Sequence, residues 1–361
     1  MNLALIRREF SATGGAELYV QRLLLALRKA GHELHLFAES WSARPEGIVL
    51  HPVSSGGNRA ERPVRFADAV ERELARHQFD CVLSLERTRR QDIYRAGDGL
   101  HREWLKQRKR FAPWWRKPFV DQGGFHSNMK ALEAQTFNPD NTRHVIVNSD
   151  MVRREILANF KFPEERIHLV RNGVDVAHYQ SGNRKALRQK YGIHDNEFLL
   201  LFAGSGWERK GLKFLLQAYE SMTANNIRLL IVGKGKKPTF TPQGVIFTGP
   251  IDDVRDAYHA ADLLVFLPVY EPSSNVVYEA LASDLAVVTT KFNGASEIIR
   301  EGKNGTVLPD PSDIPAVVKA IEKWRARRGS IETTPKEELS LERNVRETLA
   351  VIDLAMTDKG T

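Results

Sequence analysis

Apolar residues along the chain follow two alternating patterns, short continuous runs and longer stretches with helical spacing. The runs predict strands, and the spaced stretches predict helices. In the first half we expect strands at 2–6, 33–37, 48–53, 81–85 and 144–147, and helices at 17–30, 65–77, 125–137 and 149–159. This alternation is typical of a parallel sheet that helices cover on both faces.

The same alternation restarts after the segment RNGVD, residues 171–175. Here strands are predicted at 198–203, 227–232, 245–248, 263–267 and 286–290, and helices at 210–224, 252–261, 276–284 and 312–325. The fold class is therefore α/β, with two Rossmann-like, doubly wound domains at 1–170 and 171–340 that face a cleft. Ligands of such domains bind outside the carboxyl ends of the strands. A polar stretch at 326–340 precedes a last predicted helix at 341–356.

Composition places the chain among globular proteins with large cores, because its 361 residues are 42% hydrophobic and 27% charged. One cysteine, Cys81, excludes an internal disulfide and fits a reducing cytoplasm. It lies in an apolar run, which favours a buried, inert thiol over a nucleophile. The apolar stretch at the N-terminus is too short for a signal peptide, and no window has the length of a transmembrane helix. Any membrane contact is expected to be peripheral.

The net charge of +8 is confined to the first half of the chain. Residues 1–171 hold 29 Lys and Arg against 21 Asp and Glu, whereas residues 172–361 hold 24 of each kind. This excess indicates an anionic partner or surface for the first half. A basic face that is merely solvated is the alternative.

Two glycine-containing turns follow predicted strands. In FSATGGAE, residues 10–17, Gly14 and Gly15 allow close approach of a ligand to the backbone before a helix N-terminus, although a plain strand–helix turn explains them equally well. In GSGWERKG, residues 204–211, two cations follow Gly204 and Ser205 where a helix is expected to begin. Arg209 and Lys210 suit a diphosphate leaving group, and a solvated basic turn is the alternative. The spacing matches neither a dinucleotide fingerprint nor an ATP-binding loop.

A third segment, EPSSNVVYEA at 271–280, follows another predicted strand. Glu271 would lie in the loop, and Glu279 two turns into a helix whose N-cap is Ser273 or Ser274. The amides of Asn275, Val276 and Val277 would then be free to bind a phosphate. Carboxylates also suit the vicinal hydroxyls of a ribose or a hexose. Two glutamates on a helix mean little alone, but they gain weight beside the Arg–Lys turn of the same domain.

These motifs resemble those of the retaining GT-B glycosyltransferases of family 4. The resemblance rests on Glu271-x7-Glu279 and the G-S-x-x-x-R-K-G turn, supported by RNGVD (171–175), VNSD (147–150), the GGAE loop (14–17) and FTGPIDDVRDAYHAADLLVFLP (247–268). Within the family, the opening segment, the RAGDGLH region and the basic stretch after it are most similar to lipopolysaccharide core glucosyltransferases. The resemblance also implies that the helix of residues 341–361 returns to the N-terminal domain.

The family assigns roles to matching positions of this sequence. Backbone amides around Gly14 and Gly15 would contact the diphosphate or the sugar, and Arg209 and Lys210 would bind the diphosphate. The resemblance places the ribose hydroxyls on Glu279 and those of the transferred sugar on Glu271. Asp98 matches the position of a polar residue near the reacting sugar, with His101 as a neighbouring candidate. Asn275 stands where relatives often have glycine, which can alter the choice of donor.

No Asp-x-Asp motif occurs in the sequence, which fits the metal-independent chemistry of the family. We therefore expect no cofactor and no metal, with a UDP-sugar as co-substrate and arginine, lysine and amides in place of an ion. UDP rather than GDP or ADP is implied by the resemblance alone. The family also implies retention of the anomeric configuration by front-face attack, with the leaving phosphate accepting the proton of the acceptor.

Residues 101–118, HREWLKQRKRFAPWWRKP, are basic and aromatic, with seven Lys and Arg against one Glu and three of the six tryptophans. Cations attract anionic headgroups and tryptophan suits a membrane interface. Pro113 and Pro118 argue against one long helix. Packing of the tryptophans inside the fold and nucleic-acid binding are the alternatives. The side chains expected to contact the acceptor or the membrane are His101, Trp104, Lys106, Arg110, Trp114, Trp115 and Lys117.

The sequence thus predicts a hexosyltransferase that acts at the cytoplasmic face of a membrane. Its partners would be a nucleotide-sugar donor, a lipopolysaccharide or other lipid-linked glycan acceptor and an anionic membrane surface, but no nucleic acid. The transferred hexose is expected to be glucose. One alternative is a GT-B nucleotide-sugar epimerase, which would need acid–base residues instead of an acceptor site. Another is a non-enzymatic basic protein that binds membranes or RNA, which would leave both glutamates and the Arg–Lys pair unexplained.

Overall fold

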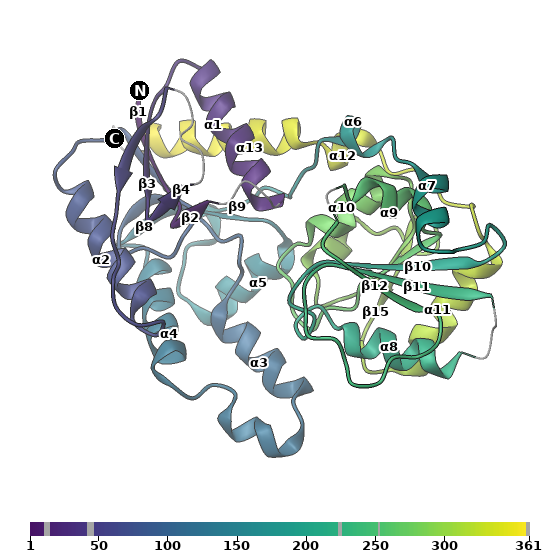
Figure 1. Cartoon of the computed structure of the whole chain (residues 1–361). Helices are drawn as coiled ribbons and strands as arrows, with labels where there is room; N and C mark the ends of the chain where they lie inside the picture. The colour runs from purple at the N-terminus through teal and green to yellow at the C-terminus, as the bar shows by residue number, and fades with distance from the viewer. Residues whose placement is uncertain (11–14, 42–46, 223–225, 252, 359–361) are drawn as a thin grey trace. The chain divides into compact units, whose positions relative to one another are not determined.

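The computed structural model describes residues 1–10, 15–41, 47–222, 226–251 and 253–358 (Figure 1). It forms two compact units. Unit 1 comprises Met1–Arg171 together with Asn344–Thr361, and unit 2 comprises Asn172–Arg343. The sequence patterns placed these divisions at 170/171 and 340/341. Each unit is built around its own parallel sheet, as the α/β prediction requires.

Unit 1 contains a seven-stranded parallel sheet with the order β5-β3-β1-β6-β7-β8-β9. Its strands are β1 (Asn2–Ile6), β3 (Glu33–Ala38), β5 (Val49–Pro52), β6 (Cys81–Ser84), β7 (Gln91–Arg95), β8 (Thr142–Val147) and β9 (Ile167–Leu169). Two short strands, β2 (Glu9–Phe10) and β4 (Ser40–Trp41), pair separately. The hydrophobic pattern missed β7 because it begins with two polar residues that are nevertheless buried, Gln91 and Asp92. It missed β9 because three residues are too few to show a pattern.

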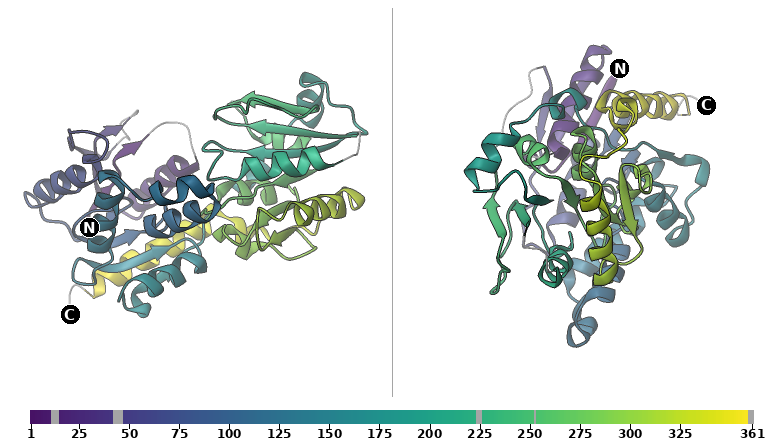
Figure 2. Two further views of the ribbon diagram at one scale, coloured as in Figure 1. Left: turned by 90° about the horizontal axis from the view of Figure 1, so that it is seen from below. Right: turned by 90° about the vertical axis from the view of Figure 1, so that its right-hand side faces the viewer.

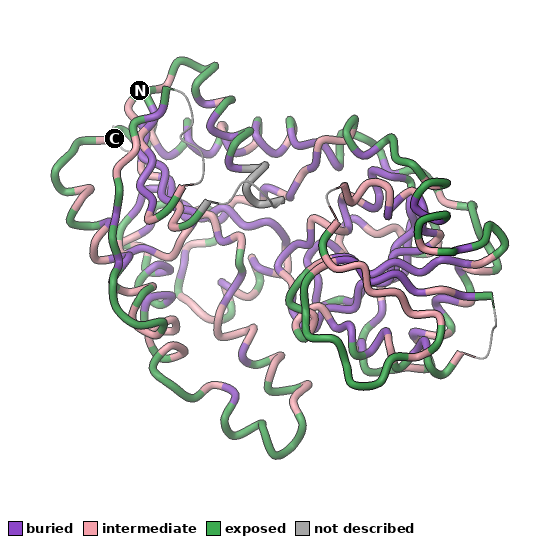
Figure 3. The backbone as a smooth tube through the Cα atoms, in the orientation of Figure 1, coloured by how far each residue is buried: buried purple, intermediate pink, exposed green. Residues whose placement is uncertain are grey.

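Helices pack on this sheet through apolar faces that the sequence spacing predicts. They include α1 (Gly15–Lys29), α2 (Arg62–Leu74) and α5 (Asp150–Asn159), while α4 (Gly124–Thr136) contacts α2 and α3 (His101–Phe111). Phe66 and Val70 of α2 form one core with Ala4, Ile6 and Phe37 of the strands. The strands run through the buried part of the unit, while the outer turns of the helices are exposed (Figure 3). Cys81, the first residue of β6, is buried as expected.

The last helix, α13 (Leu341–Thr357), joins unit 1 from Asn344 onward although it follows unit 2 in the chain. Figure 2 shows its yellow ribbon beside the blue and teal elements of unit 1. Just beyond the helix, Asp358 Oδ2 lies 3.1 Å from His144 Nε2 of β8. Among the described residues, no helix is both long enough and apolar enough to cross a membrane.

Unit 2 contains a six-stranded parallel sheet with the order β12-β11-β10-β13-β14-β15. Its strands are β10 (Phe198–Ala203), β11 (Ile227–Val232), β12 (Val245–Gly249), β13 (Leu263–Val265), β14 (Val287–Thr290) and β15 (Gly305–Leu308). Figure 1 shows α8 (Leu212–Ser221) and α11 (Ile314–Ala326) on one side of the sheet. On the other side lie α7 (Arg184–Lys190), α9 (Arg255–Ala260) and α10 (Asn275–Ala282). The pattern missed β15, a four-residue strand that begins with glycine.

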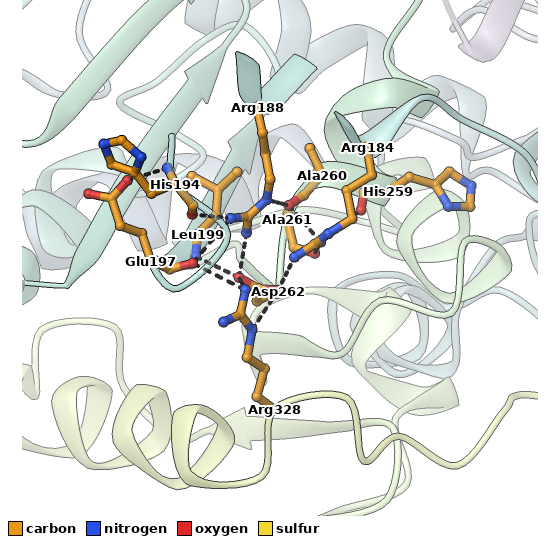
Figure 4. A network of polar contacts seen from close by, with 10 residues as sticks. All are labelled: Arg184, Arg188, His194, Glu197, Leu199, His259, Ala260, Ala261, Asp262 and Arg328. Carbon is orange, nitrogen blue, oxygen red and sulfur yellow. Dashed lines mark hydrogen bonds and ion pairs between the residues drawn. The ribbon is translucent and has the colours of Figure 1, made fainter. Parts of the chain in front are cut away.

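A buried carboxylate fixes the amino end of this sheet (Figure 4). Asp262 precedes β13 and is paired with three guanidinium groups, those of Arg184, Arg188 and Arg328, at 2.7–3.0 Å. Its Oδ2 also accepts the amide N–H of Leu199 in β10 at 2.8 Å. Arg184 and Arg188 in addition donate to the carbonyl of Ala260, the last residue of α9. One side chain therefore joins α7, β10, β13 and the chain beyond α11.

Candidate active site

The turn of residues 204–211 leaves the carboxyl end of β10 and contains three glycines with positive φ, Gly204, Gly206 and Gly211. Gly204 has φ 125° and Gly211 has φ 74°, a region that L side chains rarely adopt. A Cβ on Gly211 would lie 1.7 Å from the carbonyl oxygen of Leu267, so the turn contacts the chain after β13 backbone to backbone. Trp207 Nε1 closes the turn by donating to Gly204 O at 3.0 Å. Because α8 begins only at Leu212, Arg209 and Lys210 precede the helix rather than open it.

Lys210 lies across the start of this turn. A Cβ on Gly204 would come within 2.5 Å of Lys210 Nζ, and the same nitrogen lies 5.5 Å from the centroid of the Phe266 ring. Burial lowers the pKa of Lys210, the nearby Glu271 and Glu279 carboxylates oppose this, and Arg209 adds to it. A cation that has lost much of its hydration at a strand end binds strongly to an anion placed beside it.

Glu271 is held opposite Arg209 by the backbone on both sides. Its amide donates to Phe292 O and its carbonyl accepts from Gly294 N, both at 2.8 Å. Arg209 Nη2 lies 3.2 Å from Glu271 Oε2, and the glutamate side chain is 13% exposed. The carbonyl of Arg209 accepts from Val269 N at 3.0 Å, which ties the two loops together.

Two asparagines that sequence reasoning did not single out shape the Glu271 loop. Asn172 Nδ2 donates to Ser273 O at 3.0 Å and to Asn275 Oδ1 at 2.8 Å. Asn293 is fully buried, and its Oδ1 accepts from Ser274 N at 3.2 Å. Asn172 belongs to the RNGVD motif, so its position in the sequence was a usable signal. Asn293 lies in none of the motifs named above, so the sequence gave no signal for it.

The helix after this loop begins where the motif predicts, but its first amides are not all available. Ser274 is the N-cap of α10, although its side chain makes no capping hydrogen bond. Val277 N donates to Ser274 O at 3.2 Å, and its side chain is fully buried. The prediction that Val277 offers a free amide to a phosphate is therefore wrong, because the first turn already uses that donor. Asn275 and Val276 remain the candidates at this helix start.

Glu279 lies one turn further along α10, among aromatic hydroxyls. Tyr258 Oη donates to Glu279 Oε2 at 2.5 Å, and Tyr179 also hydrogen-bonds to this carboxyl group. Burial raises the pKa of Glu279, and the hydrogen bonds from Tyr258 and Tyr179 and the charge of Lys210 partly offset it. Tyr258, 21 residues away, lies in the motif of residues 247–268, whereas Tyr179, 100 residues away, lies in none of the motifs named above.

Ser205 of the same turn is exposed, and its Oγ accepts the amide N–H of Lys234 at 3.0 Å. This bond joins the turn to the loop after β11. In the same region Trp207 packs on Phe247, with ring centroids 5.5 Å apart. The structure thus brings Gly204, Ser205, Arg209, Lys210, Glu271, Asn275, Val276 and Glu279 to the carboxyl ends of neighbouring strands of unit 2, as expected from the fold class.

Of the predicted residues of unit 1, Asp98 lies at a cavity within that unit. Asp98 is exposed in the turn after β7 and lines a cavity of about 780 Å³. Arginines and carboxylates both line its wall, among them Arg8, Arg87 and Glu86. Burial raises the pKa of Glu86 against the charges of Arg7 and Arg8, and Asp98 adds to the rise. Of the glycine loop, Gly14 lies outside the described residues, and Gly15 is the first residue of α1.

His101 begins α3 (His101–Phe111), and a buried carboxylate fixes this helix start. The fully buried Glu133 accepts the His101 amide and pairs with Arg102 Nε at 3.1 Å and Arg87 Nη2 at 3.4 Å. The His101 Nε2 lies 3.0 Å from His126 Nδ1. Burial, assisted by the charges of Arg87, His126 and Lys130, lowers the pKa of His101 to about 4, so its imidazole is neutral at pH 7.

The basic aromatic segment is not one long helix, as its prolines predict, and the break lies at Pro113. The helix α3 ends at Phe111, and a 3₁₀ helix follows at Trp114–Phe119. Trp114 is 79% exposed, Trp115 56% and Phe119 67%, so internal packing is wrong for these three rings. Trp104 is partly buried, whereas Lys106, Arg110 and Lys117 are exposed.

Comparisons with known proteins identify the family. The description "Glycosyltransferase Family 4" matches residues 13–178, and "Glycosyl transferases group 1" matches residues 197–326. The chain is a glycosyltransferase. It is 25% identical to the lipopolysaccharide glucosyltransferase WaaG of Escherichia coli over 316 residues, 82% of each chain.

Solved structures agree with the GT-B fold. A crystal structure of WaaG has a TM-score of 0.77 at 22% identity and covers 98% of both chains. Anabaena HepE in complex with UDP and glucose has a TM-score of 0.73 at 16% identity, covering 98% of this chain and 100% of its own. Membership of this family overturns the non-enzymatic alternative, and no finding supports the epimerase.

Replacement of Gly211 tests whether the backbone contact builds the site. Gly211→Ala should lower the free energy of unfolding well beyond the left-handed strain of about 1–2 kcal/mol, because its Cβ would overlap Leu267 O. Urea denaturation measures the difference. The control is Gly192→Ala, which has φ 62° and open space around its Cβ and should show the strain alone. Equal losses in the two variants would contradict the proposed contact.

Proposed function

We propose that this glycosyltransferase transfers a hexose, glucose, from a UDP-sugar to a lipopolysaccharide core or similar lipid-linked glycan, with retention and without a metal. The observation that carries the proposal is the gathering of Arg209, Lys210, Glu271 and Glu279 at the strand ends of unit 2. The name of WaaG and the UDP and glucose in the HepE structure support the donor and the class of acceptor.

Arg209 and Lys210 would stabilise the diphosphate as it leaves. Departure of the sugar places negative charge on the β-phosphate, and fixed cations in a partly dehydrated site stabilise that charge in the transition state. The ion pair with Glu271 occupies one nitrogen of Arg209, and the guanidinium group carries further N–H donors for a phosphate. A bound diphosphate would also favour the charged form of Lys210, which burial disfavours.

The two glutamates would bind different parts of the donor. Glu279 would accept hydrogen bonds from the ribose hydroxyls, and Glu271, on the loop beside Arg209, from the hydroxyls of the hexose. The tyrosines that donate to Glu279 hold its carboxylate in one orientation. Asp98 and the charged cavity of unit 1 would receive the acceptor, with neutral His101 as a further polar group near it.

Binding of UDP by isothermal titration calorimetry tests the donor site. Glu279→Gln should weaken binding about tenfold to a hundredfold, since a hydrogen bond to a charged group contributes about 1.5–3 kcal/mol. Arg209→Ala should weaken it similarly through the diphosphate. The matched control is Glu220→Gln, an exposed glutamate of the same unit, which should leave the affinity unchanged. Equal affinity of wild type and Glu279→Gln, or a preference for GDP or ADP, would overturn this assignment.

Retention is tested by the anomeric configuration of the product. We expect proton NMR coupling constants of the transferred hexose to show the same anomer as in the donor. An inverted product would mean that a base activates the acceptor for back-side attack, and front-face attack assisted by the leaving phosphate would be wrong.

We further propose that the enzyme acts peripherally at the inner face of the cytoplasmic membrane. The exposed rings of Trp114, Trp115 and Phe119 flank Arg116 and Lys117 in the 3₁₀ helix. Exposed indoles next to cations suit the headgroup region of an anionic bilayer. Such a surface would bring the active site to a lipid-linked acceptor.

Vesicle sedimentation tests this surface. The triple variant Trp114→Ser, Trp115→Ser and Lys117→Ser should lose at least about tenfold in affinity for anionic vesicles, since one basic residue near the surface contributes about 1 kcal/mol and the indoles add apolar contact. The control changes Phe240 and Lys236, an exposed aromatic and an exposed cation of unit 2, to serine. Unchanged vesicle binding of the first variant would exclude this surface, and tighter binding to RNA than to vesicles would favour the nucleic-acid alternative.

A further inference from the structure

Three histidines and a glutamate converge at the edge of the unit 1 sheet, apart from the cavity that Asp98 lines. His35 lies on β3 and His51 on the edge strand β5, on the face that α2 covers. Glu73 lies in the last turn of α2, and His77 follows the end of that helix. Neither the family assignment nor the proposed transfer reaction gives these side chains a role.

Potential ligand atoms in this cluster lie close together. One ligand atom each of His51, Glu73 and His77 lie within 4.8 Å of one another, and His77 Nε2 is 3.7 Å from Glu73 Oε1. His51 and His77 meet edge to face with ring centroids 4.6 Å apart. The His51 ring is itself fixed, because it stacks on Phe37 with a centroid distance of 4.4 Å.

A second group of contacts, which involves His35, orients the His51 ring. His35 Nδ1 lies 2.8 Å from His51 Nε2, a hydrogen bond between two imidazoles in which one nitrogen donates and the other accepts. The other nitrogen of His35 is 3.6 Å from Glu33 Oε1. Histidines that bind a metal commonly use their second ring nitrogen in such a contact, which sets the ring orientation and raises the basicity of the ligand.

We propose that His51, Glu73 and His77 bind one Zn²⁺ ion, with His35 as the positioning residue of His51. Two imidazoles and one carboxylate are ligands that Zn²⁺ accepts, and water would complete the tetrahedron. Zinc–ligand bonds of about 2.0–2.2 Å require the ligand atoms to approach to roughly 3.4 Å. His77 is exposed and lies beyond the helix end, so rotation of its side chain can supply this movement.

The bound ion would join the edge strand β5 to the end of α2. Since the three ligands come together only in the folded chain, zinc would stabilise unit 1 by mass action, and the melting temperature would rise with zinc concentration. The alternative is that the histidines are neutral and only pack between the sheet and the helix. In that case zinc would find no preferred position among them.

Calorimetric titration of the full-length protein, without a histidine tag and after treatment with a chelator, distinguishes the two. Zinc chloride should bind at one site per chain and raise the melting temperature. His77→Gln and Glu73→Gln should each weaken binding at least about tenfold, and both replace side chains with an exposed or half-exposed end. The control His194→Gln removes an exposed histidine of unit 2 and should leave binding unchanged.

His35→Gln, a change behind the site, should weaken binding less than His77→Gln while the stoichiometry stays at one. Absence of binding, or equal weakening by His194→Gln and His77→Gln, would overturn the proposal. Binding of UDP is measured separately, so loss of the zinc site and failure of the proposed donor site give different results.

Discussion

The parallel pairing of β10 with β13 is the constraint on which the candidate site of unit 2 depends. At the amino end of these strands, the buried carboxylate of Asp262 connects both to three arginines. At the carboxyl end, the close approach of Gly211 to Leu267 holds the two following loops together. Arg209 and Glu271 extend from these loops, so their 3.2 Å contact is a consequence of the strand pairing. An unpaired buried charge at Asp262 would therefore weaken the frame of the site as well as the fold.

The electrostatics of the site favour an anionic, hydroxyl-rich ligand. Burial lowers the pKa of Lys210 and raises that of Glu279, so each group is less stable in its charged form than in water. A diphosphate beside Lys210 and hydroxyl donors around Glu279 would reverse both effects. Folding has thus placed two dehydrated groups of opposite charge where one nucleotide sugar could satisfy both.

The positively charged side chains of unit 1 lie in two different environments. Around the buried Glu133 the arginines are partly buried and paired, and they fix the start of α3. Along the 3₁₀ helix of Trp114–Phe119, cations and aromatic rings are exposed together. The first arrangement stabilises the fold. The second arrangement exposes apolar surface to solvent, which is typical of a surface that contacts another molecule or a membrane.

The sequence by itself determined the α/β class, most strands and helices, and the motif residues at the strand ends. The strands and helices follow from the local spacing of hydrophobic residues. The motif residues stand beside glycines that particular turns require. The sequence did not reveal β7, β9 and β15, because these strands are buried by neighbouring strands and have no clear hydrophobic pattern of their own. Tertiary structure alone decided that Tyr258 and Asn293 support the site, and that the amide of Val277 is already bonded. Such contacts join residues far apart in the chain, and no local pattern records a distance that only the folded sheet creates.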